Sequence, residues 1–214
     1  MSSRPVQFPC EDITLEGELH LPEENGPFPG VVACHPHPLY GGNMQNNVVT
    51  AICQALTRNS IAALRFNFRG VGNSEGRFGG GIAEQEDVRS ALAFLMSAAG
   101  IGGGRVGLVG YSFGATAAFP VALQDEKVGP LALVSPYLSD SAWEQLQGYR
   151  RLKLVVVGDA DSIIPLQRFR KYVSDTAESE EYHIVPGADH FWWGHEEELA
   201  QRVARFFAAS FGLV

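Results

Sequence analysis

Gly110-Tyr111-Ser112-Phe113-Gly114 decides the fold, because it lies where a strand is expected to lead into a helix. The apolar residues 105–109 before it are typical of a buried strand, and the small residues 115–119 after it are compatible with a helix. A sharp turn between the two pushes the serine hydroxyl out at the end of the sheet, and the flanking glycines let strand and helix approach closely. We therefore interpret Ser112 as a candidate nucleophile. An ordinary turn between strand and helix is the alternative.

Strand and helix patterns alternate along the rest of the chain. Strands are expected over residues 30–34, 61–67, 105–109, 130–134, 152–157 and 182–185, and helices over residues 48–56, 83–98, 166–173 and 196–211 and directly after Ser112. Residues 13–21 alternate apolar and polar side chains, as an exposed antiparallel strand does, and residues 6–8 are expected to pair with them. We expect residues 100–104 to form a flexible turn, and residues 13–21 are a possible pairing surface for a second copy.

This alternation predicts an α/β fold. The expected architecture is a mostly parallel central sheet with an antiparallel N-terminal edge and helices on both faces. A length of 214 residues, without a linker or an internal repeat, fits one domain over residues 1–214.

Composition restricts the partners and the compartment. A net charge of −8 leaves no basic excess to neutralise phosphates, so we expect no nucleic-acid partner. No run of about 18 apolar residues is present, and the N-terminal residues have no apolar signal region, so no membrane partner is expected. Cys10, Cys34 and Cys53 have no paired spacing and indicate a reducing compartment. We expect a cytoplasmic protein, monomeric or homodimeric, whose partner is a small molecule.

Polar side chains that follow the predicted strands supply possible partners for Ser112. In open α/β sheets, reactive groups gather beyond the carboxyl ends of the strands. Asp159 and Asp161 follow the strand over 152–157. Asp159 comes directly after a glycine and is suited to shaping the turn, whereas Asp161 lies deeper in the loop and can turn towards the next one. We favour Asp161 as the acid.

Three histidines follow these acids in the chain. His183 lies within a strand pattern, and His195 opens the last helix among glutamates, so both are interpreted as structural. His190 lies in a loop and is the preferred base, while Asp189 beside it is expected to bond within the loop. A serine hydroxyl needs a base to remove its proton, and imidazole, with an ordinary pKa of about 6.5, suits that task at neutral pH. A buried carboxylate then orients the ring.

Backbone N–H groups are needed to stabilise the negative charge that such an attack creates. Phe113, the residue after the serine, is expected to supply one. The loop over residues 35–43, His-Pro-His-Pro-Leu-Tyr-Gly-Gly-Asn, is expected to supply the second. Prolines have no N–H, so the donor is either His37 or Leu39. His35 and His37 also suggest a metal site, but no third ligand with suitable spacing follows, so neither a metal nor another cofactor is expected.

With these residues assembled, the chain resembles the α/β-hydrolase superfamily over nearly its whole length. Ser112, Asp161 and His190 occur in the chain order of that superfamily's Ser-Asp-His triads. Residues 67–74, Asn-Phe-Arg-Gly-Val-Gly-Asn-Ser, look like the Asp-x-Arg-Gly-x-Gly-x-Ser segment of the superfamily. Asn67 takes the place of the usual aspartate, which we interpret as structural variation.

The loop over 35–43 and residues 187–191, Gly-Ala-Asp-His-Phe, are similar to compact, cap-less bacterial hydrolases related to the dienelactone hydrolases. Dienelactone hydrolases proper use a cysteine nucleophile where this chain has Ser112, and that difference favours esterase chemistry over dienelactone as a substrate. The chain has no stretch long enough for a large cap. Residues 137–150 are expected to form at most a small cover over the site.

The resemblance implies a serine hydrolase that cleaves a small carboxylic ester or thioester through an acyl-enzyme intermediate, without a cofactor. Tyr40, Tyr137 and Trp192 are expected to line the substrate pocket and to favour an apolar or aromatic acyl group. The alternatives are a peptidase or a C–C bond hydrolase with the same triad, or a non-catalytic binding module with this fold.

Overall fold

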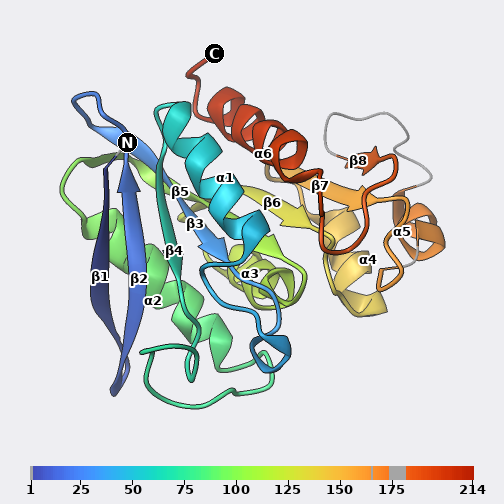
Figure 1. Ribbon diagram of the computed structural model, residues 1–214, viewed down its shortest axis with the longest axis horizontal. Helices are drawn as coiled ribbons and strands as arrows, with labels where there is room; N and C mark the ends of the chain where they lie inside the picture. The colour runs from blue at the N-terminus through green and yellow to red at the C-terminus, as the bar shows by residue number, and fades with distance from the viewer. Residues whose placement is uncertain (1, 165, 174–181) are drawn as a thin grey trace.

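An eight-stranded sheet runs through the part of the molecule that the computed structural model describes, residues 2–164, 166–173 and 182–214 (Figure 1). Its strand order is β1-β2-β4-β3-β5-β6-β7-β8. The strands are β1 (Ser2–Cys10), β2 (Ile13–Leu21), β3 (Phe28–Cys34), β4 (Ala62–Phe66), β5 (Ile101–Tyr111), β6 (Val128–Val134), β7 (Lys153–Gly158) and β8 (Tyr182–Val185). The α-helices are α1 (Asn47–Arg58), α2 (Glu84–Ser97), α3 (Phe113–Gln124), α4 (Asp140–Gly148), α5 (Leu166–Val173) and α6 (Glu196–Ser210), and Pro38–Tyr40 forms the short 3-10 helix η1.

Strand directions confirm the predicted mixed sheet. β1 pairs with β2 and β2 with β4 in antiparallel fashion, and every other neighbouring pair is parallel. All residues of β4, β6 and β7 are buried, because helices cover both faces of the sheet. The carboxyl ends of the parallel strands therefore meet along one edge, where the loops that carry Ser112, Asp161 and His190 emerge.

Two apolar cores lie on the two faces of this sheet. In Figure 1, α1 and α6 cross in front of the strands, where Ile52 and Phe207 belong to one core. On the other face, α2 and α3 bury Leu92 and Phe119 in the second core. No helix within the described residues is both long enough and apolar enough to cross a lipid bilayer.

The N-terminal edge differs from the expected arrangement. β1 pairs with β2 along its whole length, from Ser2 opposite Leu21 to Cys10 opposite Ile13, so it is much longer than residues 6–8. β2 therefore lies inside the sheet, between β1 and β4, and residues 13–21 are not a free pairing surface. The edge strand β1 contains two prolines, which have no N–H to donate to a further strand.

Two further segments correct the sequence-based expectations. β5 begins at Ile101, so residues 101–104 are strand and only Gly100, with φ +87°, keeps a turn conformation. Gly102 is required for close packing, since a Cβ there would lie 2.6 Å from the Cβ of Pro27. Residues 140–148 form the helix α4, whose Trp143 is buried with its ring centroid 6.0 Å from that of Phe169. α4 is therefore packed into the hydrophobic core and does not form a cover over the site.

Candidate active site

Ser112 occupies the sharp turn between β5 and α3. Its backbone has φ 54° and ψ −116°, a conformation that non-glycine residues rarely adopt. The two flanking glycines make the turn possible. A Cβ on Gly110 would lie 2.6 Å from the carbonyl oxygen of Gly114, and a Cβ on Gly114 would lie 2.2 Å from that of Cys34. This confirms the predicted strand–turn–helix arrangement and explains both glycines by close backbone approach.

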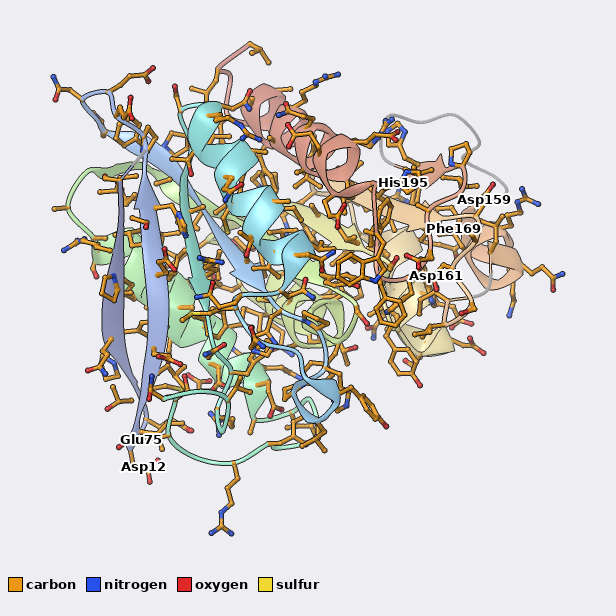
Figure 2. The ribbon with its side chains drawn as sticks, in the orientation of Figure 1. Asp12, Glu75, Asp159, Asp161, Phe169 and His195 are labelled. Atoms are coloured by element: carbon orange, nitrogen blue, oxygen red, sulfur yellow. The ribbon has the colours of Figure 1, made fainter. Side chains whose placement is uncertain are left out.

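The structure brings Ser112, His190 and Asp161 together from three different loops. His190 Nε2 lies 3.0 Å from Ser112 Oγ, and His190 Nδ1 lies 2.8 Å from Asp161 Oδ2. All three side chains are largely buried, and the side chain of Asp161 lies among the loops beyond β7 (Figure 2). The hydroxyl of Tyr111 donates to the backbone carbonyl of His190 at 2.7 Å and fixes the loop that carries the imidazole.

Asp161 is held as an ionised carboxylate. Its Oδ1 accepts hydrogen bonds from the backbone N–H groups of Ile163, at 2.9 Å, and Ile164, at 2.8 Å, while Oδ2 faces His190. Burial works against the charged form, but the hydrogen bonds from His190 and from the Ile164 N–H outweigh it and lower the pKa of Asp161. A carboxylate in this position keeps the proton of the imidazole on Nδ1, so the Nε2 lone pair faces the serine hydroxyl.

The competing acids have structural contacts of their own. Asp159 Oδ1 accepts a hydrogen bond from the N–H of Gly187 at 2.6 Å, so it joins the turn after β7 to the loop after β8. Asp189 Oδ1 accepts one from the N–H of Phe191 at 3.0 Å, within its own loop. The contact of Asp189 agrees with its expected role within the loop, whereas Asp159 bonds across two loops instead of within its own turn. Asp161 is the carboxylate bonded to the imidazole.

The other two histidines of this region also lie apart from the serine. His183 Nδ1 lies 2.9 Å from Arg202 Nη1, on the side of α6. His195 precedes α6, and its Nδ1 lies 3.8 Å from a carboxylate oxygen of Glu198. His190 is the histidine that contacts the hydroxyl of Ser112.

The two expected donors in the loop after β3 have different surroundings. The N–H of Leu39 donates to His37 Nδ1 at 3.2 Å, and the Leu39 side chain is 67% exposed. Leu39 is thus engaged within η1, whereas His37 lies along the wall of the cavity that contains Ser112. Phe113 also lines this cavity and begins α3, so its N–H is among those without a partner inside the helix.

His35 fixes the direction of the His37 N–H through the peptide that joins Pro36 and His37. His35 Nδ1 lies 2.6 Å from the carbonyl oxygen of Pro36, and Nε2 accepts a hydrogen bond from the N–H of Phe68 at 3.1 Å. These partners require a neutral ring protonated on Nδ1, and burial indeed lowers the pKa of His35 to about 4. In a planar trans peptide the C=O and N–H groups point in opposite directions. Because the His35 ring holds the Pro36 carbonyl, the His37 N–H of the same peptide must point away from that ring.

The replacement of the superfamily's aspartate by Asn67 has a structural reason. Asn67 Oδ1 accepts from the N–H of Met44 at 2.7 Å, and Asn67 Nδ2 donates to Glu16 Oε1 at 2.6 Å. An aspartate would place a second carboxylate against Glu16, whereas the amide satisfies both neighbours. Asn67 thus anchors the far end of the loop that begins at His35.

A cavity of about 660 Å³ opens at Ser112. Tyr40 and Tyr137 line it as expected, and Ile163 and Phe191 line it as well. The described lining contains no lysine, arginine, aspartate or glutamate. The sequence analysis missed Phe191, although its place directly after His190 was a usable signal. A cavity of this kind suits an uncharged, apolar or aromatic group.

Trp192 corrects the expected pocket. Its side chain is completely buried, it is absent from the cavity wall, and its Nε1 donates to Ser135 Oγ at 3.2 Å. A backbone φ of +61° turns Trp192 into the core, while Phe191 and Trp193 on either side are more than half exposed.

These features define the class of protein. A serine on a strand-to-helix turn, facing an imidazole and a carboxylate at the carboxyl edge of a mixed sheet, makes the chain a compact, cap-less α/β-hydrolase. Residues 12–202 match the model of the X-Pro dipeptidyl-peptidase (S15) family, and the chain belongs to that family.

Solved structures and a sequence relative agree with this class. An alpha-beta serine hydrolase homologue from Coxiella burnetii is 31% identical, with a TM-score of 0.83 over 96% of this chain and 97% of its own. A serine hydrolase without a lid from Xanthomonas campestris is 27% identical, with a TM-score of 0.81 over 98% of this chain and 95% of its own. An uncharacterized protein of Rickettsia prowazekii is 30% identical over 82% of this chain and 76% of its own length.

Proposed function

We propose that this hydrolase is a serine esterase that cleaves small, uncharged carboxylic esters or thioesters through an acyl-enzyme intermediate. The observation that carries the proposal is the position of His190, with one ring nitrogen 3.0 Å from the hydroxyl of Ser112 and the other 2.8 Å from Asp161. This arrangement supplies a nucleophile, a base and an orienting carboxylate.

The first half of the reaction forms the acyl-enzyme. His190 Nε2 takes the proton of Ser112 as the serine oxygen bonds to the carbonyl carbon of the substrate. The carbonyl oxygen becomes an oxyanion, which accepts hydrogen bonds from the N–H groups of Phe113 and His37. When the tetrahedral intermediate collapses, the bond to the alcohol or thiol breaks, and His190 gives its proton to that leaving group.

The second half releases the acid. His190 removes a proton from a water molecule, whose oxygen attacks the acyl carbon bound to Ser112. The second tetrahedral intermediate breaks its bond to the serine oxygen, which recovers a proton from His190. Asp161 stays ionised throughout and stabilises the imidazolium that forms twice in each cycle.

A peptidase activity is the second candidate, because the chain belongs to the X-Pro dipeptidyl-peptidase family. A dipeptidyl-peptidase must recognise the free N-terminal ammonium of its substrate, and a carboxylate is the usual partner for such a group. The described wall of the cavity contains no carboxylate, and Asp161 is buried behind His190. This absence among the described residues favours an ester over an X-Pro peptide.

The thiols support a proposal about the compartment. Cys10, Cys34 and Cys53 are all buried and unpaired. Three free thiols suit a reducing compartment, which supports our proposal that the enzyme works in the cytoplasm.

A substrate panel tests the proposed function. Purified protein is assayed with p-nitrophenyl esters of short, long and aromatic acids and with X-Pro p-nitroanilides, and Ser112→Ala serves as the control. We expect hydrolysis of the esters, none of the anilides, and loss of ester hydrolysis in Ser112→Ala. Hydrolysis of the anilides alone would replace the esterase by the peptidase, and ester hydrolysis that survives in Ser112→Ala would overturn the assignment of the nucleophile.

A further inference from the structure

We propose that Ser135 and Trp192 are positioning residues that hold the carboxylate of Asp161 in place behind His190. The inference rests on the proposed function, because it assigns a task to two side chains that do not line the substrate cavity. It also gives Trp192 a role in place of the substrate contact expected from the sequence.

Ser135 is bonded to the strand that leads to the acid of the site. It follows β6, and its N–H donates to the carbonyl oxygen of Val156 in β7 at 2.8 Å, so its backbone is fixed to the strand that leads to Asp161. Its side chain is completely buried. The hydroxyl accepts a hydrogen bond from Trp192 Nε1 at 3.2 Å. Its interaction with the Asp161 carboxylate is among the causes that lower the pKa of that group despite burial.

The direction of these hydrogen bonds follows from the chemistry of the groups. The indole N–H of Trp192 is only a donor, and an ionised carboxylate is only an acceptor. Ser135 must therefore accept from the indole and donate its own proton to Asp161. The indole N–H occupies one acceptor site of the Ser135 hydroxyl, and the proton of that hydroxyl remains available for the Asp161 carboxylate. The result is a directed chain from Trp192 through Ser135 and Asp161 to His190.

Backbone strain points to the same cluster. Within the described residues, five non-glycine residues have a positive φ, and three of them are Ser112 at 54°, Ser135 at 40° and Trp192 at 61°. Such conformations are unfavourable for residues with a Cβ, above all for a large ring, and persist only where the surroundings impose them. The strain therefore lies at the nucleophile and at the two residues that support its acid.

The expected effect of this support is on proton affinity. Each donor to the carboxylate stabilises its ionised form. Without the proton of Ser135, Asp161 becomes more basic and stabilises the protonated form of His190 more strongly. The Asp161–His190 pair should then take up its proton at a higher pH than in the wild type. As the pH falls, His190 is therefore protonated, and lost as a base, at that higher pH.

The test is a set of variants with a matched control. Ser135→Ala, Ser135→Cys, Trp192→Phe and the double variant Ser135→Ala/Trp192→Phe are compared with Trp193→Phe, which changes an exposed ring next in the chain. The pH dependence of kcat/KM with p-nitrophenyl acetate is measured, and the imidazole resonances of the Asp161–His190 pair are titrated by NMR. The NMR titration does not depend on turnover, so a failure of the esterase proposal leaves this test intact.

In Ser135→Ala, we expect the acidic limb of the kcat/KM pH profile to move to higher pH by about 0.5 to 1 unit, and the NMR titration of the imidazole to move by the same amount. Ser135→Cys, a weak donor of similar size, should shift both by less, as should Trp192→Phe, while Trp193→Phe should shift neither. The double variant should match Ser135→Ala, because the indole acts only through the hydroxyl. Unchanged titration in the folded Ser135→Ala and Ser135→Cys proteins would overturn the proposal. Additive shifts in the double variant would also overturn it.

Discussion

Replacing Asp161 by asparagine should abolish most of the activity while leaving the fold intact. The two backbone N–H groups of Ile163 and Ile164 both donate to Oδ1, so the amide oxygen of an asparagine must take that position. The amide nitrogen is then forced to the Oδ2 position, 2.8 Å from His190 Nδ1. A donor now faces a donor, and the imidazole relieves the conflict by moving its proton to Nε2.

That tautomer cannot accept the proton of Ser112. The corresponding change in the Ser-His-Asp template lowers kcat by about 10,000-fold, which corresponds to about 5.5 kcal/mol of transition-state stabilisation. We expect a loss of that size in Asp161→Asn, because two constraints prevent the groups from rearranging. The oxygen at the Oδ1 position is held by two backbone N–H groups, and the imidazole of His190 is buried. KM should change little, since the side chain does not contact the cavity.

The assay is steady-state hydrolysis of a p-nitrophenyl ester across the pH range, with thermal unfolding as the check on the fold. Asp159→Asn is the matched control, because that aspartate lies two residues away and contacts the N–H of Gly187, not the imidazole, and the amide oxygen of an asparagine can accept the same hydrogen bond. Asp159→Asn should keep nearly all activity. A loss of less than about tenfold in Asp161→Asn would refute the orienting role, as would an equal loss in Asp159→Asn.

Two further predictions concern His35. His35→Asn keeps a donor where Nδ1 bonds the Pro36 carbonyl, whereas His35→Gln keeps only an acceptor for the Phe68 N–H. The asparagine variant should therefore have a kcat about tenfold or more above that of the glutamine variant, with similar KM. Equal kcat values would contradict the claim that His35 orients the His37 N–H through the Pro36 carbonyl. The folded protein keeps His35 neutral down to about pH 4, while an unfolded histidine takes up its proton near about pH 6.5. As the pH falls from about 6.5 to about 4, the wild type should therefore lose up to about 3 kcal/mol of unfolding free energy. His35→Asn should lose less over the same range, and chemical denaturation at each pH measures both losses.

The sequence predicts the strand–turn–helix at Ser112 because local signals agree there. An apolar strand, two glycines and a run of small residues all favour the same arrangement, and the close contacts at Gly110 and Gly114 explain why. The structure brings Asp161 and His190 to Ser112, as their position after parallel strands predicts. Their catalytic role stays a prediction.

The errors arise where long-range contacts override a local pattern. Gly102 looks like a turn residue, yet its lack of a side chain serves the approach of Pro27. Trp192 looks like a pocket aromatic, yet a positive φ turns it inward to a hydrogen bond with Ser135, a residue 57 positions away. Neither Pro27 nor Ser135 lies in the local stretch of sequence from which these two expectations were drawn.

The claim that His190 activates the Ser112 hydroxyl has one most direct test. Intact wild-type protein and the His190→Ala variant are treated with a fluorophosphonate, and the adducts are located by peptide mass spectrometry. We predict one adduct, on Ser112, that forms rapidly in the wild type and at least about a hundredfold more slowly without the imidazole. Wild-type protein that forms no adduct, or adduct formation at the same rate in His190→Ala, would contradict the claim.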